Sequence, residues 1–170
     1  MQMRLFIAVE FDDSVLDVLK KLQSEWMSLG VRGNFTPLSN LHLTLAFIGD
    51  YGMPDRILDV MDCVPFSPFS LRLDGVGNFD DLYWVGIEPN KELGAYVSRL
   101  RKALAQNGIP YDKKRFSPHI TLIRRAVLNC PLEELLQNPP CATMKITSIS
   151  LMSSTRGKNG MIYTKIGSIE

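Results

Sequence analysis

The sequence holds few cysteines and no long apolar run, and each absence excludes a class of protein. Cys63, Cys130 and Cys141 are odd in number and lack metal-type spacing, so they predict neither a disulfide framework nor a zinc site. No apolar run approaches the roughly 20 residues that span a membrane. The stretch Met1–Leu5 lacks the charged and apolar regions of a secretory signal peptide. We therefore expect a cytoplasmic protein that does not enter membranes.

The net charge is also small, because the charges of the 170 residues sum to only +1 at pH 7. This balance argues against a non-specific nucleic-acid binder. The charges are unevenly spread: residues 99–125 hold eight basic residues and one acid, whereas residues 50–92 hold nine acids and three basic residues. The basic segment favours an anionic ligand, although a solvated helix face explains its first three charges as well. Its Lys113-Lys114-Arg115 run fits a solvated loop or a contact with phosphate or RNA equally well.

The chain has two histidines, and both open the same four-residue pattern. The two copies are His42-Leu43-Thr44-Leu45 and His119-Ile120-Thr121-Leu122. The stretches 40–48 and 117–123 around them are apolar and favour strands. Because successive side chains of a strand point to opposite faces, the histidine and threonine of each copy share one face. A lone histidine in a strand is more often structural, but the duplication favours a functional pair.

Hydrophobic periodicity predicts alternating helices and strands along the chain. Beyond the two histidine strands, we expect helices at residues 14–29, 54–63, 91–107 and 131–136, and strands at residues 5–11, 69–76, 82–88, 146–152 and 161–169. A polar loop is expected at residues 32–40 and a polar turn at residues 153–160.

The order of these elements repeats after 77 residues. The offset carries His42 to His119, Thr44 to Thr121, Leu5 to Leu82 and Pro54 to Pro131. Such a repeat predicts one domain, residues 1–170, built from two units at about residues 1–77 and 78–154 with a closing strand at 161–169. We expect a pseudo-twofold axis between the units that brings both histidine strands into one cleft.

Two imidazoles that face one ligand can move protons in both directions. With a pKa of about 6.5, one neutral histidine takes a proton from water while a protonated one gives a proton to a leaving oxygen. The Thr44 and Thr121 hydroxyls can donate to phosphate oxygens, and Arg124 or Arg125 can neutralise charge that grows in the transition state. This chemistry suits attack on phosphorus. Two histidines with threonine neighbours fall short of the usual metal-ligand count, so we expect no metal and no cofactor.

The paired His-x-Thr-x motifs resemble those of the 2H phosphoesterases. Within that family, the chain is similar to the bacterial and archaeal RNA 2′,3′-cyclic phosphodiesterases, also called 2′-5′ RNA ligases. The likeness extends over nearly the whole chain and rests on Arg4–Val9, Asn40–Gly49, Phe116–Arg124 and the closing strand that contains Tyr163. The resemblance implies a bilobal α+β fold, with an antiparallel sheet and helices in each lobe and the active-site groove between them.

The resemblance also implies an activity, the metal-independent hydrolysis of an RNA 2′,3′-cyclic phosphate to a 2′-phosphomonoester. His42 would be the proton donor to the departing 3′ oxygen, and His119 would be the proton acceptor that activates water. Thr44, Thr121 and Arg124 would hold the phosphate. The substrate partner would be an RNA or oligonucleotide with a 2′,3′-cyclic phosphate end, and we expect a monomer.

The sequence leaves some assignments open. Phe116, Arg125 and Tyr163 are candidate substrate contacts, although ordinary packing would explain the two aromatic side chains as well. The same histidines would also serve the reverse reaction, 2′-5′ RNA ligation. A phosphodiesterase for a small cyclic nucleotide and a non-catalytic module that binds RNA or phosphate are also compatible with the sequence.

Overall fold

The computed structural model describes residues 3–170, so Met1 and Gln2, on which the signal-peptide expectation partly rests, lie outside the described residues. In chain order the elements are β1 (Arg4–Glu10), α1 (Asp13–Ser28), β2 (Arg32–Phe35), a 3₁₀ helix (Leu38–Asn40), β3 (His42–Asp50), α2 (Pro54–Cys63), β4 (Phe69–Phe79), β5 (Leu82–Ile87), α3 (Lys91–Gln106), β6 (His119–Val127), α4 (Leu132–Leu136), β7 (Thr143–Ile146), β8 (Ile149–Gly157) and β9 (Gly160–Ile169). Over residues 3–170, no helix is long and apolar enough to cross a membrane.

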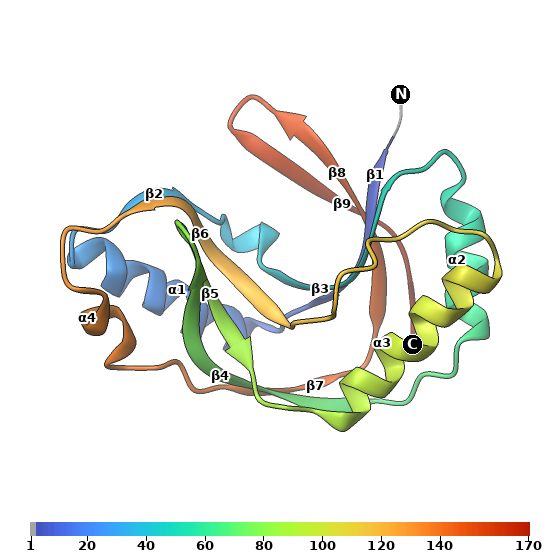
Figure 1. Ribbon diagram of the computed structural model, residues 1–170, viewed down its shortest axis with the longest axis horizontal. Helices are drawn as coiled ribbons and strands as arrows, with labels where there is room; N and C mark the ends of the chain where they lie inside the picture. Colours follow the sequence, from blue (N-terminus) through green and yellow to red (C-terminus); the bar gives the residue numbers. More distant parts are fainter. Residues whose placement is uncertain (1–2) are drawn as a thin grey trace.

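Within residues 3–170, the strands form two antiparallel sheets (Figure 1). The first sheet has the strand order β3-β1-β8-β9, and the second has the order β2-β6-β5-β4-β7. Helices α2 and α3 pack against the first sheet, whereas α4 packs against the second. Helix α1 also lies on the second sheet, where Trp26 meets Tyr83 of β5 edge-on at 6.2 Å. The predicted α+β class, with an antiparallel sheet and helices in each of two lobes, is confirmed.

Each lobe combines segments from both halves of the chain. Strand β4, from the first half, pairs with β5, and β8, from the second half, pairs with β1. Helix α1, from the first half of the chain, likewise contacts a strand from the second half, since the Gln23 side chain donates to the Leu122 carbonyl of β6 at 3.0 Å. The two histidine strands still occupy equivalent places, β3 beside β1 and β6 beside β5. The repeat at residues 1–77 and 78–154 stays a prediction about the sequence, and its two units do not correspond to the two lobes.

The long helices begin where short polar side chains cap them. At the start of α1, the Asp12 carboxylate accepts the Val15 N–H at 3.0 Å, and at the start of α3 the Asn90 side-chain oxygen accepts the Leu93 N–H at 3.0 Å. Each bond satisfies a backbone donor that has no partner within the helix, which typically stabilises a helix by about 1 kcal/mol. The caps fix the residues at which α1 and α3 begin.

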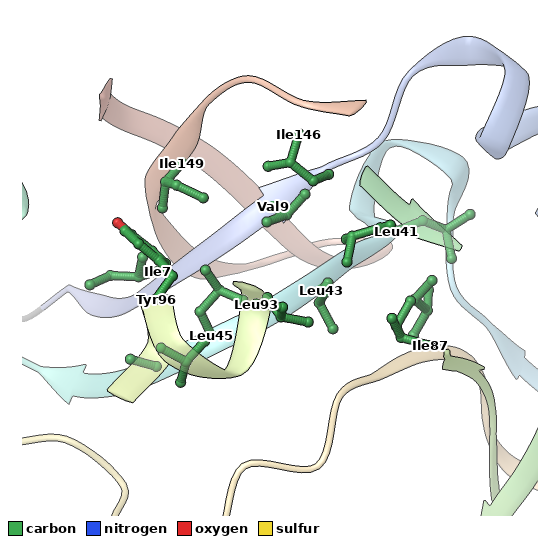
Figure 2. Close-up of a cluster of buried hydrophobic side chains, with 14 of the residues drawn as sticks. Ile7, Val9, Leu41, Leu43, Leu45, Ile87, Leu93, Tyr96, Ile146 and Ile149 are labelled. Carbon is green, nitrogen blue, oxygen red and sulfur yellow. The ribbon is translucent and has the colours of Figure 1, made fainter. Parts of the chain in front are cut away.

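The apolar residues of the first histidine motif belong to the main core. Figure 2 shows Leu43 and Leu45 of β3 packed with Ile7 of β1 and with Leu93 and Tyr96 of α3. Both motif leucines are fully buried, and each burial contributes roughly 1.5–3 kcal/mol. Because side chains alternate along a strand, this burial turns the histidine and threonine of the motif to the opposite face of the first sheet.

The predicted polar loop at residues 32–40 is wrong in part. Residues Arg32–Phe35 form the edge strand β2, and a 3₁₀ helix follows at Leu38–Asn40. The strand is held by backbone pairing to β6, with Asn34 opposite Arg124. Since residues 32–34 are exposed, this four-residue strand carries no alternation of apolar and polar side chains that would reveal it.

The C-terminal region also differs from the prediction. The strand expected at residues 146–152 is two strands, because β7 ends at Ile146 in the second sheet and β8 begins at Ile149 in the first. The predicted turn at residues 153–160 is shorter than expected and comprises only Lys158 and Asn159, since β8 continues to Gly157 and pairs there with Gly160 of β9. Its polar residues belong to a long hairpin whose end extends beyond the residues of β8 that pair with β1.

Candidate active site

Both histidine motifs line one groove between the two lobes. The groove has a volume of about 920 Å³, and its walls include His42 and Thr44 from β3 and His119 and Thr121 from β6. The first pair belongs to the first sheet and the second pair to the second sheet. The predicted cleft, with one imidazole and one hydroxyl from each lobe, therefore has the expected geometry.

A backbone carbonyl orients each imidazole ring. His42 Nδ1 lies 2.7 Å from the Asn40 carbonyl, and His119 Nδ1 lies 2.8 Å from the Ser117 carbonyl. Because a carbonyl can only accept, Nδ1 carries the proton in both rings, and Nε2 of the neutral ring has a free lone pair. His42 Nε2 lies 2.9 Å from Thr44 Oγ1, so the threonine hydroxyl donates to it when the ring is neutral.

Aromatic side chains enclose the His42 ring. Phe6 lies 4.9 Å from it between ring centroids, and Tyr163 meets it nearly perpendicularly at 5.2 Å. This burial lowers the pKa of His42 below its ordinary value of 6.5 by more than the hydrogen bond to the Asn40 carbonyl raises it, and the charge of Arg124 and the nearby His119 lower it further. Burial therefore favours the neutral imidazole in the free protein.

The His119 ring also has aromatic neighbours, which the sequence motifs did not indicate. Phe79 lies 5.3 Å from the ring and Trp84 lies 6.1 Å from it. Phe79 is 48% exposed at the end of the β4–β5 hairpin. Gly77 pairs with Trp84, and a Cβ at that glycine would lie 2.3 Å from the indole ring. The glycine thus makes room for the indole that packs beside His119.

Each histidine strand has a β-bulge at the same place in its motif. In β3 the bulge residue is Leu45, and in β6 it is Leu122, 77 residues later. A bulge inserts one extra residue and shifts the alternation of side chains. As a result, the fifth residue after each histidine returns to the groove, where it is Phe47 in β3 and Arg124 in β6. The two lobes thus place an aromatic ring and a cation at equivalent positions.

The two neighbouring arginines have different places. Arg124 lines the groove, whereas Arg125 is exposed outside its lining, with a left-handed φ of 54°. The backbone of β2 approaches β6 closely at this point. A Cβ on Gly33 would lie 2.8 Å from the Arg125 carbonyl oxygen and 2.9 Å from that of Arg124, so only glycine fits there.

The two aromatic candidates for substrate contact also lie in different places. Tyr163 lines the groove beside His42. Phe116 packs against the main core, and the Arg101 guanidinium lies 5.6 Å from the centre of its ring. Phe116 is not among the described residues that line the groove.

The groove is also lined by residues that the two histidine motifs did not indicate. One of them, Asn40, is 8% exposed, and its side chain donates to the Met161 carbonyl at 2.9 Å, which ties the β8–β9 hairpin to the start of β3. A polar residue two positions before the first motif histidine, within an otherwise apolar stretch, is the signal that could have identified it. The others are Asn34, Phe35, Thr36, Pro37, Phe47, Asp112, Lys114, Asn159, Gly160 and Met161. Among residues 3–170, no three His, Cys, Asp or Glu side chains are grouped so that they could hold a metal ion.

The sequence is similar to proteins that share one name. An Archaeoglobus fulgidus protein named RNA 2′,3′-cyclic phosphodiesterase is 29% identical over 171 residues, which cover 95% of this chain and 96% of the relative. An Escherichia coli protein of the same name is 30% identical over 135 residues, which cover 75% of this chain and 73% of the relative.

Solved structures share the two-sheet fold. Escherichia coli LigT complexed with 3′-AMP has a TM-score of 0.83 at 23% identity, over 99% of this chain and 98% of LigT. The Thermus thermophilus protein TT0787 has a TM-score of 0.77 at 26% identity, over 98% and 97% of the two chains. The family described as the 2′-5′ RNA ligase superfamily matches residues 12–158, most of the chain. The resemblance inferred from the two motifs is confirmed, and this chain belongs to the 2′-5′ RNA ligase superfamily.

Proposed function

We propose that this protein hydrolyses the 2′,3′-cyclic phosphate at the end of an RNA to a 2′-phosphomonoester, without a metal ion or cofactor. The observation that carries the proposal is the pair of imidazoles in one groove, each with Nδ1–H on a carbonyl, so that proton transfer falls to Nε2, which in His42 is bonded to the Thr44 hydroxyl. The relatives named RNA 2′,3′-cyclic phosphodiesterase support the same substrate class. We also propose that the protein acts as a monomer in the cytoplasm.

In the proposed reaction, a water molecule and the 3′ oxygen occupy opposite sides of the phosphorus. Nε2 of neutral His119 takes a proton from the water, and the water oxygen forms a bond to phosphorus. The bond between phosphorus and the 3′ oxygen breaks, and Nε2–H of protonated His42 gives its proton to that oxygen. The 2′ ester bond remains, so the product is a 2′-phosphomonoester. Proton exchange with solvent restores the starting forms of both rings.

The acid role of His42 requires a proton that the free site disfavours. Its pKa is lowered by burial first and also by the charge of Arg124. A bound phosphate diester carries a negative charge, which favours the imidazolium form and raises this pKa in the complex. Protonated His42 carries a hydrogen on Nε2, so the Thr44 hydroxyl no longer donates to this nitrogen and its proton is free to reach a phosphate oxygen, while Nε2–H points to the 3′ oxygen.

The remaining roles follow from the walls of the groove. Arg124 is placed to neutralise charge that develops on the phosphate oxygens, and Thr121 to donate to one of them. Tyr163 and Phe47 give the His42 side an aromatic wall on which the terminal base can stack. The proposed site leaves out Arg125 and Phe116, which do not line the groove.

The identity of the product tests this proposal. An oligonucleotide that ends in a 2′,3′-cyclic phosphate is incubated with the protein and excess EDTA, and the phosphorus NMR spectrum is followed. We expect the cyclic phosphate signal to be replaced by that of a 2′-phosphomonoester. A 3′-phosphate product, or turnover that EDTA abolishes, would contradict the proposal. Addition of an RNA with a 5′-hydroxyl end then measures ligation as the ratio of joined to hydrolysed ends.

A further inference from the structure

We propose that residues 111–116 form the surface over which the RNA strand leading to the cyclic phosphate runs, so that the preferred substrate is an oligonucleotide and not a single nucleotide. We call this segment the basic loop. The inference rests on the proposed function, because it extends the same groove. It gives a role to Lys113-Lys114-Arg115, which take no part in the proton transfers.

Hydrogen bonds fix the basic loop along the outer edge of β3. The Asp112 N–H donates to the Phe47 carbonyl at 2.8 Å. Arg101, on α3, donates through Nη1 to the Lys114 carbonyl at 2.7 Å, and through Nε and Nη2 to the Leu45 carbonyl at 3.3 and 3.2 Å. Strand β3 is at the edge of the first sheet, and its Phe47 and Leu45 carbonyls accept these hydrogen bonds from outside the sheet. The loop therefore follows the strand that carries the first histidine motif.

The basic loop presents cations where it meets the groove. All three consecutive basic residues are exposed, and Lys114 lines the groove. The neighbouring Asp112 also lines it, and its carboxylate accepts the Lys114 N–H at 3.0 Å, which fixes the turn. Exposed cations along a groove attract the phosphates of a single strand without reading its bases. Because the loop is already held in place, binding orders less of the chain than it would for a mobile loop.

The proposed orientation of the substrate leads toward this loop. If the departing 3′ oxygen lies beside His42, the terminal ribose lies over the groove face of the first sheet. The strand can leave that face over the β3 edge, where the basic loop lies, or over the β8–β9 hairpin. The hairpin has the exposed cations Arg156 and Lys158, but it lines the groove with Asn159, Gly160 and Met161. The basic loop lines the groove with a cation, Lys114, so the geometry favours the loop.

The test compares two substrates that share the same terminal nucleoside 2′,3′-cyclic phosphate, an oligonucleotide and the mononucleotide. The readout is the ratio of their kcat/KM values at low salt, since Lys114 also lines the groove that both substrates enter. Three variants remove exposed cations from different places: the loop variant Lys113→Ser/Lys114→Ser/Arg115→Ser, the hairpin variant Arg156→Ser/Lys158→Ser, and a remote control Lys20→Ser/Lys21→Ser/Lys145→Ser on α1 and β7.

We expect the wild-type protein to prefer the oligonucleotide, and the loop variant to lower the ratio by about 10- to 100-fold, the size expected from three exposed phosphate contacts. The log–log dependence of the oligonucleotide kcat/KM on salt should also become shallower by about two in slope. The remote control keeps the wild-type ratio, because its cations lie outside the groove lining.

Other results would overturn the inference. A ratio that falls in the hairpin variant but not in the loop variant would place the strand on the opposite rim. A wild-type protein without preference, or a loop variant with an unchanged ratio, would show that no strand runs over the loop. If the wild-type protein turns over neither substrate, the proposed function fails and the inference fails with it. Turnover of the mononucleotide separates that case from the others.

Discussion

At the residue scale, strand alternation predicts that the histidines and threonines of the two motifs share a face, whereas Arg124 is indicated by the family resemblance and not by alternation. Strict alternation from His119 places Arg125, and not Arg124, on the histidine face. The bulge at Leu122 reverses this order, and it depends on pairing between β6 and β5 that no local pattern reveals. The position of Phe79 beside His119 could not be predicted for a similar reason, because only the pairing of β4, β5 and β6 brings the two side chains together.

The first residue-scale prediction concerns the pKa of His42. The positive charge of Arg124 disfavours the imidazolium form and so lowers that pKa. The variant Arg124→Gln should therefore raise the pKa of His42. Proton NMR titration can measure the shift directly, because only two imidazole signals are present in the chain.

The matched control for this titration is Arg125→Gln. It removes the same charge one residue away, outside the groove lining, and its charge is not among the causes of the His42 shift. The control should leave the His42 titration near its wild-type midpoint. Equal shifts in both variants would show that the effect depends on net charge and not on the position of Arg124.

At the scale of elements, helices and the strands with apolar alternation were predictable, whereas the edge strand β2 and the end of the β8–β9 hairpin were not. The α2 bounds, Pro54–Cys63, agree with the prediction because a proline opens the helix and apolar residues recur along it. Three of the four side chains of β2 are exposed and the strand pairs with β6 through its backbone, so sequence patterns miss it. The end of the β8–β9 hairpin is rich in polar residues and glycine, which is why the sequence predicts a turn there.

A prediction at this scale concerns Arg101, which joins the bulge of β3 to the basic loop. The Leu45 carbonyl belongs to a residue with no exposed surface, and Arg101 is its charged donor. The variant Arg101→Met should lower the free energy of unfolding by about 2–3 kcal/mol, since a buried acceptor loses its partner. Urea denaturation measures the change.

Arg99→Met, on the same helix, is the control for the Arg101 variant. Arg99 is exposed and makes one bond, to the Pro65 carbonyl at 3.1 Å. Its loss should cost about 0.5–1 kcal/mol, as for other exposed bonds. If both variants lose the same free energy, the bulge carbonyl has no special dependence on Arg101.

At the scale of the whole molecule, the duplicated pattern predicted one cleft but not how the lobes are assembled. The exchange of β4 and β8 between the sheets leaves the local sequence pattern of each strand unchanged, so a repeat alone cannot reveal it. The exchange ties the two halves of the chain together on both sides of the groove. The relative placement of His42 and His119 therefore depends on the complete fold and not on either half.

The central claim is that these two histidines, one from each lobe, carry out the proton transfers of cyclic phosphate hydrolysis. The most direct measurement is the single-turnover rate on an oligonucleotide 2′,3′-cyclic phosphate, in excess EDTA, for the wild-type protein, His42→Ala, His119→Ala and the double variant. We predict that each single change slows hydrolysis by roughly 10²–10⁴-fold. The double variant should lose less than the product of the two, since both groups act in one transition state. If either single variant, shown to be folded by its thermal melt, hydrolyses the substrate within about tenfold of the wild-type rate, the two-histidine mechanism is contradicted.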